Sequence, residues 1–142
     1  MTAIDFYTHV TDKLRTACRL AGKAHAGGLH VHVACPDADT AQALDRLLWT
    51  ASPTGFVPHC DPQHRLAPVT AVHIDHTGAD PLHDGVLINL RAEQPPYFSR
   101  FERLIEIVSL DDEDRRLARE RYRFYRERGY PLDSHDLSRS AQ

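Results

Sequence analysis

The sequence predicts an α/β sandwich in which a largely parallel sheet is flanked by helices. Short apolar runs alternate along the chain with segments whose apolar residues recur at helical spacing, a pattern typical of parallel strands joined by helices. The 142 residues, 42% of them hydrophobic, suffice for one domain with a sizeable core and are too few for two. We expect a single domain over residues 1–133 and a polar C-terminal tail over residues 134–142.

Two strand–helix units are expected in the N-terminal half. In each unit a short apolar run predicts the strand, and a helical pattern of apolar residues follows it. The expected elements are a strand over Ile4–Val10, a helix from Asp12 to Gly27, a strand over Leu29–Cys35 and a helix over residues 37–49.

Three further strands are expected in the second half of the chain. A loop rich in proline and histidine leads to a short strand at Val69–Ile74, and a polar turn precedes a buried central strand at Val86–Leu90. The apolar run Arg103–Ser109 is expected to be the last strand of the sheet.

The most clearly bounded element is a helix that follows Ser109. Ser109 and Asp112 fit a capping box, and a run of acids fills the first turn, where the positive end of the helix dipole favours them. Gly129 is placed to take a left-handed conformation at the helix end, and Pro131 blocks continuation.

This helix carries a basic stripe with a tyrosine in it. At roughly 100° per residue, five of its residues fall within an arc of about 100°, while Leu117 and Phe124 lie opposite and are expected to face the core. The five residues of this basic stripe are Arg115, Arg119, Tyr122, Arg123 and Arg126.

The helix is positively charged in an otherwise acidic chain. Between Arg115 and Arg128, seven arginines face only two glutamates, a net charge of +5, whereas the whole chain carries −3 and the remainder therefore −8. One interpretation is a solvated face held by pairs four residues apart, Arg116 with Glu120 and Arg123 with Glu127. The other is a docking site for an anionic partner, which the exclusive use of arginine favours because its guanidinium binds carboxylates and phosphates in two-point contacts.

No catalytic site, metal or cofactor is expected. The sequence has neither a glycine-rich phosphate loop nor an identifiable nucleophile elbow, and the spacing of its ten histidines matches no known ligand pattern. Cys18 and Cys35 are expected to be small buried thiols. Without a signal pattern or an apolar run of about 20 residues, the protein is expected to be cytoplasmic.

Four segments together resemble the chi subunits of bacterial DNA polymerase III holoenzyme. They cover most of the chain in the order that the family has, and the stretch from Ile4 to Gly28 resembles the opening of β-proteobacterial members. The segments are LLWTASPTGFVPHC at Leu47–Cys60, VLINL at Val86–Leu90, FERLIEIV at Phe101–Val108 and RRLARERYRFYRERGYPL at Arg115–Leu132.

The resemblance implies a Rossmann-like, non-catalytic accessory subunit of the clamp-loader complex. Its implied partners are the psi subunit and the C-terminal tail of single-stranded DNA-binding protein, which ends in acids, a proline, a phenylalanine and a free carboxylate; DNA is contacted only indirectly. The implied tail-binding residues are Val108, Arg115, Arg119, Tyr122, Arg123 and Arg126. The implied psi-binding residues are Trp49, Phe56, Val57 and Pro58.

Alternatives remain for both groups of residues. The arginine helix could bind nucleic acid directly, although the acidic remainder and the shortage of interleaved aromatic residues disfavour this. From pattern alone, Trp49 and its neighbours would be ordinary core. Within the helix, the remaining arginines Arg116, Arg121 and Arg128 are expected to take no part in binding.

Overall fold

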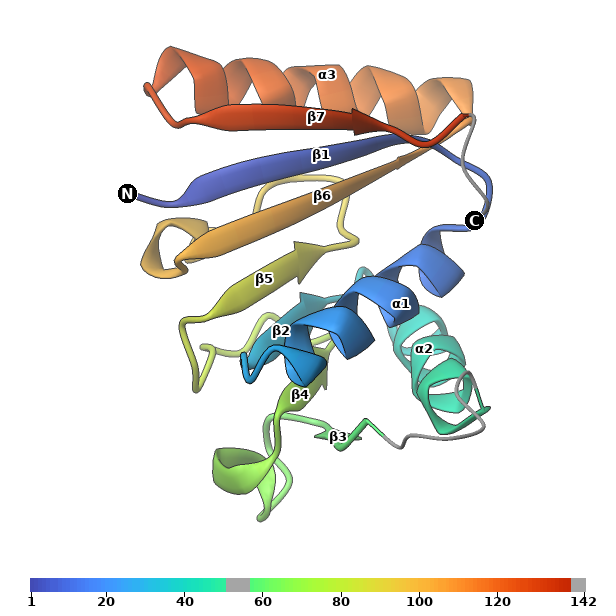
Figure 1. Ribbon diagram of the computed structural model, residues 1–142, viewed down its shortest axis with the longest axis vertical. Coiled ribbons are helices and arrows are strands. Elements are labelled where there is room, and N and C mark those ends of the chain that lie inside the picture. Colours follow the sequence, from blue (N-terminus) through green and yellow to red (C-terminus); the bar gives the residue numbers. More distant parts are fainter. Residues whose placement is uncertain (51–56, 139–142) are drawn as a thin grey trace.

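The computed structural model describes residues 1–50 and 57–138, and within them the chain forms a seven-stranded sheet (Figure 1). Every strand pair is parallel, and the strand order is β3-β4-β2-β5-β6-β1-β7. This confirms the predicted α/β sandwich. The strands are β1 (Ala3–Val10), β2 (Val31–Ala34), β3 (His59–Cys60), β4 (Val72–Asp75), β5 (Val86–Asn89), β6 (Arg103–Ser109) and β7 (Leu132–Asp136).

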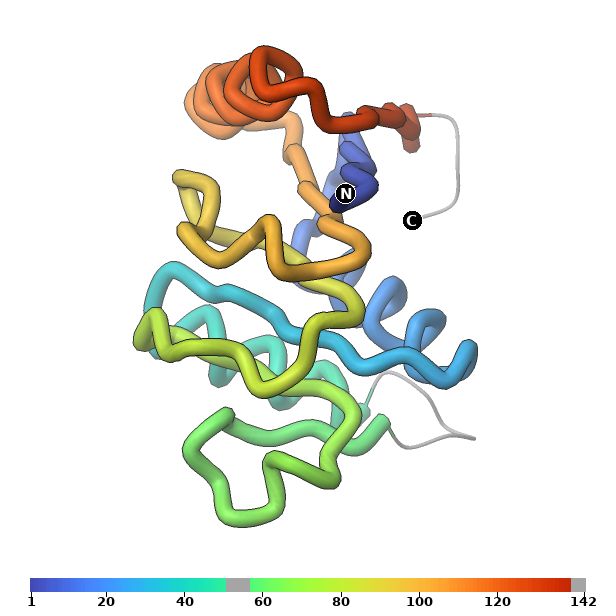
Figure 2. The backbone as a smooth tube through the Cα atoms, turned by 90° about the vertical axis from the view of Figure 1, so that its left-hand side faces the viewer, coloured from blue at the N-terminus to red at the C-terminus, as the bar shows by residue number. Residues whose placement is uncertain are grey.

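Helices cover both faces of the sheet. They are α1 (Lys13–Ala26), α2 (Ala38–Thr50) and α3 (Asp112–Glu127), with short 3-10 turns at Ala67–Val69 and Phe98–Arg100. Figure 2 shows α3 and α1 on opposite sides of the sheet. None of the described helices is long and apolar enough to span a membrane.

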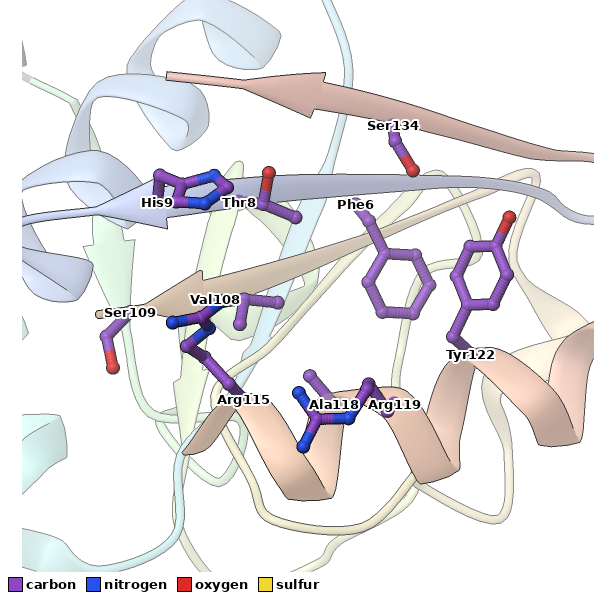
Figure 3. A pocket seen from close by; sticks show the side chains of 10 residues that line it. All are labelled: Phe6, Thr8, His9, Val108, Ser109, Arg115, Ala118, Arg119, Tyr122 and Ser134. Carbon is purple, nitrogen blue, oxygen red and sulfur yellow. The ribbon is translucent and has the colours of Figure 1, made fainter. Parts of the chain in front are cut away.

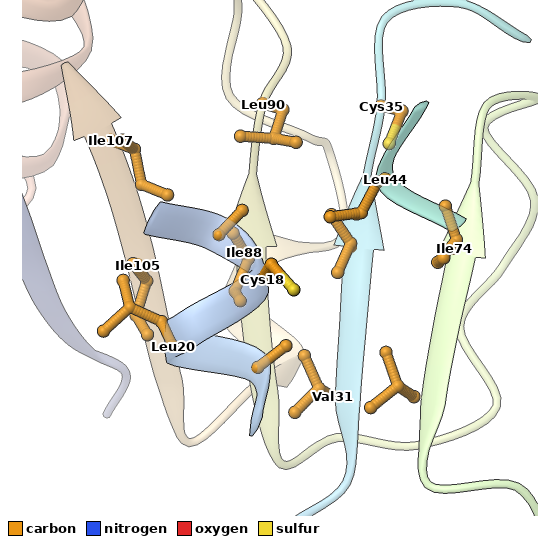
Figure 4. Packing of buried hydrophobic residues seen from close by; sticks show 14 of the residues in the cluster. Cys18, Leu20, Val31, Cys35, Leu44, Ile74, Ile88, Leu90, Ile105 and Ile107 are labelled. Carbon is orange, nitrogen blue, oxygen red and sulfur yellow. The ribbon is translucent and has the colours of Figure 1, made fainter. Parts of the chain in front are cut away.

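Each face of the sheet has its own hydrophobic core. The core beneath α1 and α2 is aliphatic, with Leu44, Ile88 and Ile107 among its fully buried members (Figure 4). The core beneath α3 is rich in aromatic rings and includes Phe6 and Tyr125. Because alternate residues of β5 and β6 enter opposite cores, the central strands are buried on both faces, as expected for a parallel sheet.

The prediction that Arg103–Ser109 is the last strand is wrong. The chain returns after α3 and adds β7 at the edge of the sheet, where Leu132 to Asp136 pair with Ile4 to Thr8 of β1. The start of the expected polar tail is therefore part of the sheet. An edge strand has one neighbour and mostly exposed side chains, so its polar sequence carries none of the apolar alternation that predicts a strand.

Helix α3 is capped at both ends as predicted, but its N-cap residue is a different one. The N-cap is Asp111, whose side chain accepts from the Asp114 backbone N–H, and not Ser109 as expected. Asp114 completes the cap by accepting from the backbone N–H and the hydroxyl of Ser109, at 2.8 and 2.9 Å. At the other end Gly129 has φ +80°, which confirms the predicted left-handed exit.

The face that α3 buries differs from the predicted one. Its buried residues are Ala118, Arg121 and Tyr125, while Leu117 and Phe124 are only partly buried. On the helical wheel this turns the inner face by about 80° from the predicted position. The basic stripe therefore begins next to the sheet rather than opposite it, and a polar residue, Arg121, occupies the centre of the buried face.

Candidate functional site

A pocket of about 270 Å³ lies between α3 and the carboxyl ends of β1 and β6 (Figure 3). Its size is just below the roughly 300–1,000 Å³ typical of small-molecule sites, so it suits one side chain of a partner and the groups around it. The residues that line it are Phe6, Thr8, His9, Val108, Ser109, Arg115, Ala118, Arg119, Tyr122 and Ser134.

Four of the six predicted tail-binding residues line this pocket. Val108, Arg115, Arg119 and Tyr122 are brought together there, although Val108 belongs to β6 and the others to α3. The remaining two, Arg123 and Arg126, are exposed on the same helix and do not line the pocket. The stripe therefore starts inside a pocket and continues along an open surface.

The floor of the pocket is apolar. Val108 and Ala118 are buried, and the rings of Phe6 and Tyr122 meet edge to face with centroids 5.2 Å apart. Phe6 belongs to the core beneath α3, and Tyr122 packs against that core. An aromatic or aliphatic group of a partner would thus find a preformed apolar surface beneath a row of cations.

The seven arginines from Arg115 to Arg128 fall into two groups according to their partners. Arg116 pairs with Glu113 and, at 3.1 Å, with Glu120, and the Arg128 guanidinium lies 3.6 Å from the centroid of the Phe124 ring. Arg121 pairs with Glu106 inside the protein. In residues 1–50 and 57–138, no acidic partner is found for the four arginines of the basic stripe, Arg115, Arg119, Arg123 and Arg126.

The partners of these arginines test the interpretation that the basic stripe is a solvated helix face held by its own ion pairs. Of its two expected pairs, Arg116 with Glu120 forms, whereas Arg123 with Glu127 does not form within the described chain. Acids beside the pocket already have cationic or histidine partners, since Asp114 lies 3.2 Å from Lys13 and Asp136 lies 3.1 Å from His9. Within residues 1–50 and 57–138, the four stripe arginines therefore meet no carboxylate of the protein's own.

Arg121, which is expected to take no part in binding, lies on the buried face of α3. It is 2% exposed, and its Nε donates to Glu106 at 3.0 Å while its Nη1 donates to the Ala92 carbonyl at 2.7 Å. Tyr125 donates to the same carboxylate at 2.6 Å, as does the Asn89 amide. Burial raises the pKa of Glu106, and the Arg121 charge and these hydrogen bonds oppose that effect.

This buried network fixes how α3 sits on the sheet. Its members come from β5, β6 and the inner face of the helix, and they join the helix to both strands. Because hydrogen bonds are directional, the network sets the rotation of α3 about its axis. That rotation is what presents the basic stripe at the rim of the pocket.

Of the predicted psi-binding residues, Trp49, Val57 and Pro58 lie between the end of α2 and β3, at the opposite edge of the sheet from the strands that border the pocket (Figure 1). Trp49, at the end of α2, is 62% exposed, and its ring meets that of His59 edge to face at 5.4 Å. Pro58 is partly buried, and Val57 packs partly buried against the core. Phe56 lies outside the described residues. The core-packing alternative is thus wrong for Trp49.

Three of the histidines stack on one another, and two of the three cysteines are buried. His83 stacks between His30 and His73, with centroids 4.0 and 4.8 Å away. Among residues 1–50 and 57–138, no group of three or more histidine, cysteine or acidic side chains could hold a metal ion. Cys18 and Cys35 are buried as predicted, and burial raises the pKa of Cys35 to about 12.

The residue pattern does not predict the second wall of the pocket. Thr8 and His9 of β1 and Ser134 of β7 face α3 across the cavity. Strand β7 was not expected at all, and the irregularity in β1 that turns His9 toward α3 leaves no signature in the residue pattern. Only the structure brings this wall together with the stripe.

Comparison with known proteins finds one family. The model of the DNA polymerase III chi subunit, HolC, matches residues 1–133. A DNA polymerase III subunit chi of Pseudomonas aeruginosa is 36% identical over 98% of this chain and 99% of its own length. The subunit chi of Haemophilus influenzae is 32% identical over 85% of each chain, and that of Escherichia coli K12 is 30% identical over 82% of this chain and 80% of its own.

Proposed function

Because this chain belongs to the DNA polymerase III chi subunit family, we propose that it is a non-catalytic accessory subunit of the clamp-loader complex in the cytoplasm. In this role it links the complex, through psi, to the acidic C-terminal tail of single-stranded DNA-binding protein during replication. The observation that carries the proposal is a set of four arginines that have no acidic partner in the described part of the chain, two of which line an apolar pocket. An acidic peptide with an apolar end matches both features.

The pocket and the stripe would bind different parts of the tail. Phe6, Tyr122 and Val108 would receive the phenylalanine ring, because aromatic rings favour edge-to-face and offset contacts with one another. Arg119, Arg123 and Arg126 would meet the acids. A charge-assisted hydrogen bond contributes about 1.5–3 kcal/mol when shielded and less when exposed, so the pocket arginines should contribute more than those on the open surface.

A peptide that copies the tail of the cognate single-stranded DNA-binding protein tests the tail site. We expect it to bind the wild-type protein, and we expect Arg119→Ala and Tyr122→Ala to abolish binding, as measured by fluorescence anisotropy of the labelled peptide. Because the attraction acts largely between solvent-accessible charges, affinity should fall as salt is added. Undiminished binding by both variants would refute the site.

The psi contact is proposed for the exposed surface around Trp49. A large aromatic side chain that is 62% exposed at a helix end is typical of a protein-binding surface. Trp49→Ala should lose co-purification with psi and keep its melting temperature, because the side chain contributes little to the core. Loss of stability with pairing retained would assign Trp49 to the fold instead.

Direct nucleic-acid binding is the competing function for the same arginines. Phosphates are equally good anions for guanidinium groups, but the remainder of the chain carries a charge of −8 around the +5 segment. Naked single-stranded DNA and the same strand coated with the DNA-binding protein separate the two functions. Equal affinity for both would favour direct contact.

A further inference from the structure

Strand β1 is irregular where it borders the pocket. It pairs with β6 in regular register from Ala3 to Tyr7, but the next partners are Val10 and Ser109. Three steps along β1 therefore match two steps along β6, from Ile107 to Ser109. One extra residue in one strand is a β-bulge, a feature that is common beside functional sites because it redirects a side chain.

The bulge changes which face His9 belongs to. In a regular strand alternate residues share a face, so Tyr7 and His9 would both lie beneath α1. Instead Tyr7 and Val10, three residues apart, both pack on that side. Thr8 and His9 lie between them and both line the pocket beneath α3 (Figure 3).

The conformation of His9 is strained. Its φ is +58°, and His9 is the one non-glycine residue with positive φ among those described. This left-handed region favours glycine, and strained residues of this kind cluster at functional sites. A histidine is thus kept where a glycine would fit with less strain, and the redirected ring faces the pocket.

The chemistry at this end of the pocket suits a carboxylate. His9 and Arg115 lie at one end of the cavity in Figure 3, and Phe6 and Tyr122 lie at the other. Asp136 Oδ1 lies 3.1 Å from His9 Nδ1, which is within ion-pair distance. An imidazole that carries protons on both nitrogens can face Asp136 with Nδ1–H and donate its Nε2–H to a ligand carboxylate.

We propose that His9, with Arg115, binds the terminal carboxylate of the peptide in the pocket. This inference rests on the proposed function. With the last side chain of the peptide against Phe6 and Tyr122, its own carboxylate can reach no further than the same small cavity. The upstream acids then run along Arg119, Arg123 and Arg126, so the peptide has one direction, with its C-terminus toward the β1 bulge.

The test pairs His9→Gly with amidation of the peptide. Glycine accepts positive φ, so the variant should melt at the same or a higher temperature than wild type, and a loss of binding cannot then come from unfolding. We expect affinity for the free-acid peptide to fall about three- to tenfold, the range for a partly exposed charged contact. Amidation should weaken wild-type binding more than it weakens binding by His9→Gly.

Two further variants serve as controls. His9→Asn keeps a residue that tolerates left-handed φ and replaces the imidazole by a shorter, uncharged amide, so it should bind more weakly than wild type and no more weakly than His9→Gly. His135→Ala removes a histidine from β7 whose ring stacks on Tyr7, on the other side of the sheet, with centroids 4.6 Å apart. It should leave both affinity and the amidation effect unchanged.

The outcomes separate this inference from the proposed function. If wild type binds the peptide while His9→Gly changes neither affinity nor the amidation effect, the role of His9 is refuted and the tail site stands. If His9→Gly binds the peptide more weakly but amidation still reduces its affinity as much as it does for wild type, the contact with the terminal carboxylate is also refuted. If wild type does not bind at all, the proposed function fails and this inference fails with it.

Discussion

Arg119 and Arg121 stand two residues apart on α3 and have opposite environments. Arg121 is buried on the inner face, where it joins a carboxylate, a tyrosine and an amide in one network. Arg119 is exposed on the outer face, at the rim of a pocket, with no acidic partner in the part of the chain that the structure describes. The same side chain thus serves the fold in one place and is left available for a ligand in the other.

Breaking the inner network should have the largest effect. Arg121→Ala leaves Glu106 buried without its cation, and removal of one partner of a buried ion pair costs about 3–5 kcal/mol. Urea unfolding should show this loss for Arg121→Ala and a change within about 0.5 kcal/mol for Arg119→Ala, as for an ordinary surface position.

A double variant separates charge from packing at this site. Arg121→Met combined with Glu106→Leu removes both charges, and replacement of a buried pair by apolar residues is often neutral or better. It should therefore be more stable than Arg121→Ala. Equal stability of Arg119→Ala and Arg121→Ala would contradict the division of α3 into two faces.

Acid should weaken the fold without altering the charge of the stripe. Burial lowers the pKa of His32 from 6.5 to about 4. Between these values the unfolded chain binds a proton that the folded chain does not, so the free energy of unfolding falls as pH drops from about 6.5 to 4, by up to about 3 kcal/mol. The pKa of His83 is also lowered by burial and by His30, which adds to the effect in the same direction.

Unfolding measured across this pH window checks the assignment. His32→Phe removes the titrating group and keeps an aromatic ring beside Tyr97 and Phe101, so stability should depend less steeply on pH. The exposed His64 provides a control, and His64→Ala should keep the wild-type slope. An unchanged slope in His32→Phe would show that another group carries the acid sensitivity.

The sequence predicted those parts of the fold that carry a strong periodic pattern. The central strands and the three helices have apolar residues at regular spacing, and Gly129 marks the end of α3. Strands β3 and β7 were not predicted. A short or polar strand at the edge of a sheet buries few apolar side chains, so its sequence lacks the apolar pattern of a strand. The cap at Asp111 rather than Ser109 was missed because several capping residues stand close together.

Of the residues that line the candidate site, the sequence predicted the arginines and the tyrosine of α3 but not those on β1 and β7. Helical geometry grouped the basic stripe because residues three and four apart share a face. It could not show that Arg121 meets Glu106, since the sequence does not say which strand lies beneath the helix. The role of His9 depends on a β-bulge. Regular alternation along β1 would assign His9 to the wrong face of the sheet, because the bulge shifts the pattern by one residue.

We propose that the acidic tail binds those arginines on the outer face of α3 that have no acidic partner in residues 1–50 and 57–138, and does not respond to the positive charge of the helix in general. Arg119→Ala and Arg116→Ala test it directly, because each removes one exposed arginine from the same helix. Of the two, Arg116 alone has acidic partners among the residues that the structure describes. In titrations with the tail peptide, Arg119→Ala should bind at least about tenfold more weakly, equivalent to about 1.4 kcal/mol, while Arg116→Ala stays near wild type. Equal losses in the two variants would contradict the claim and leave only a general attraction to positive charge.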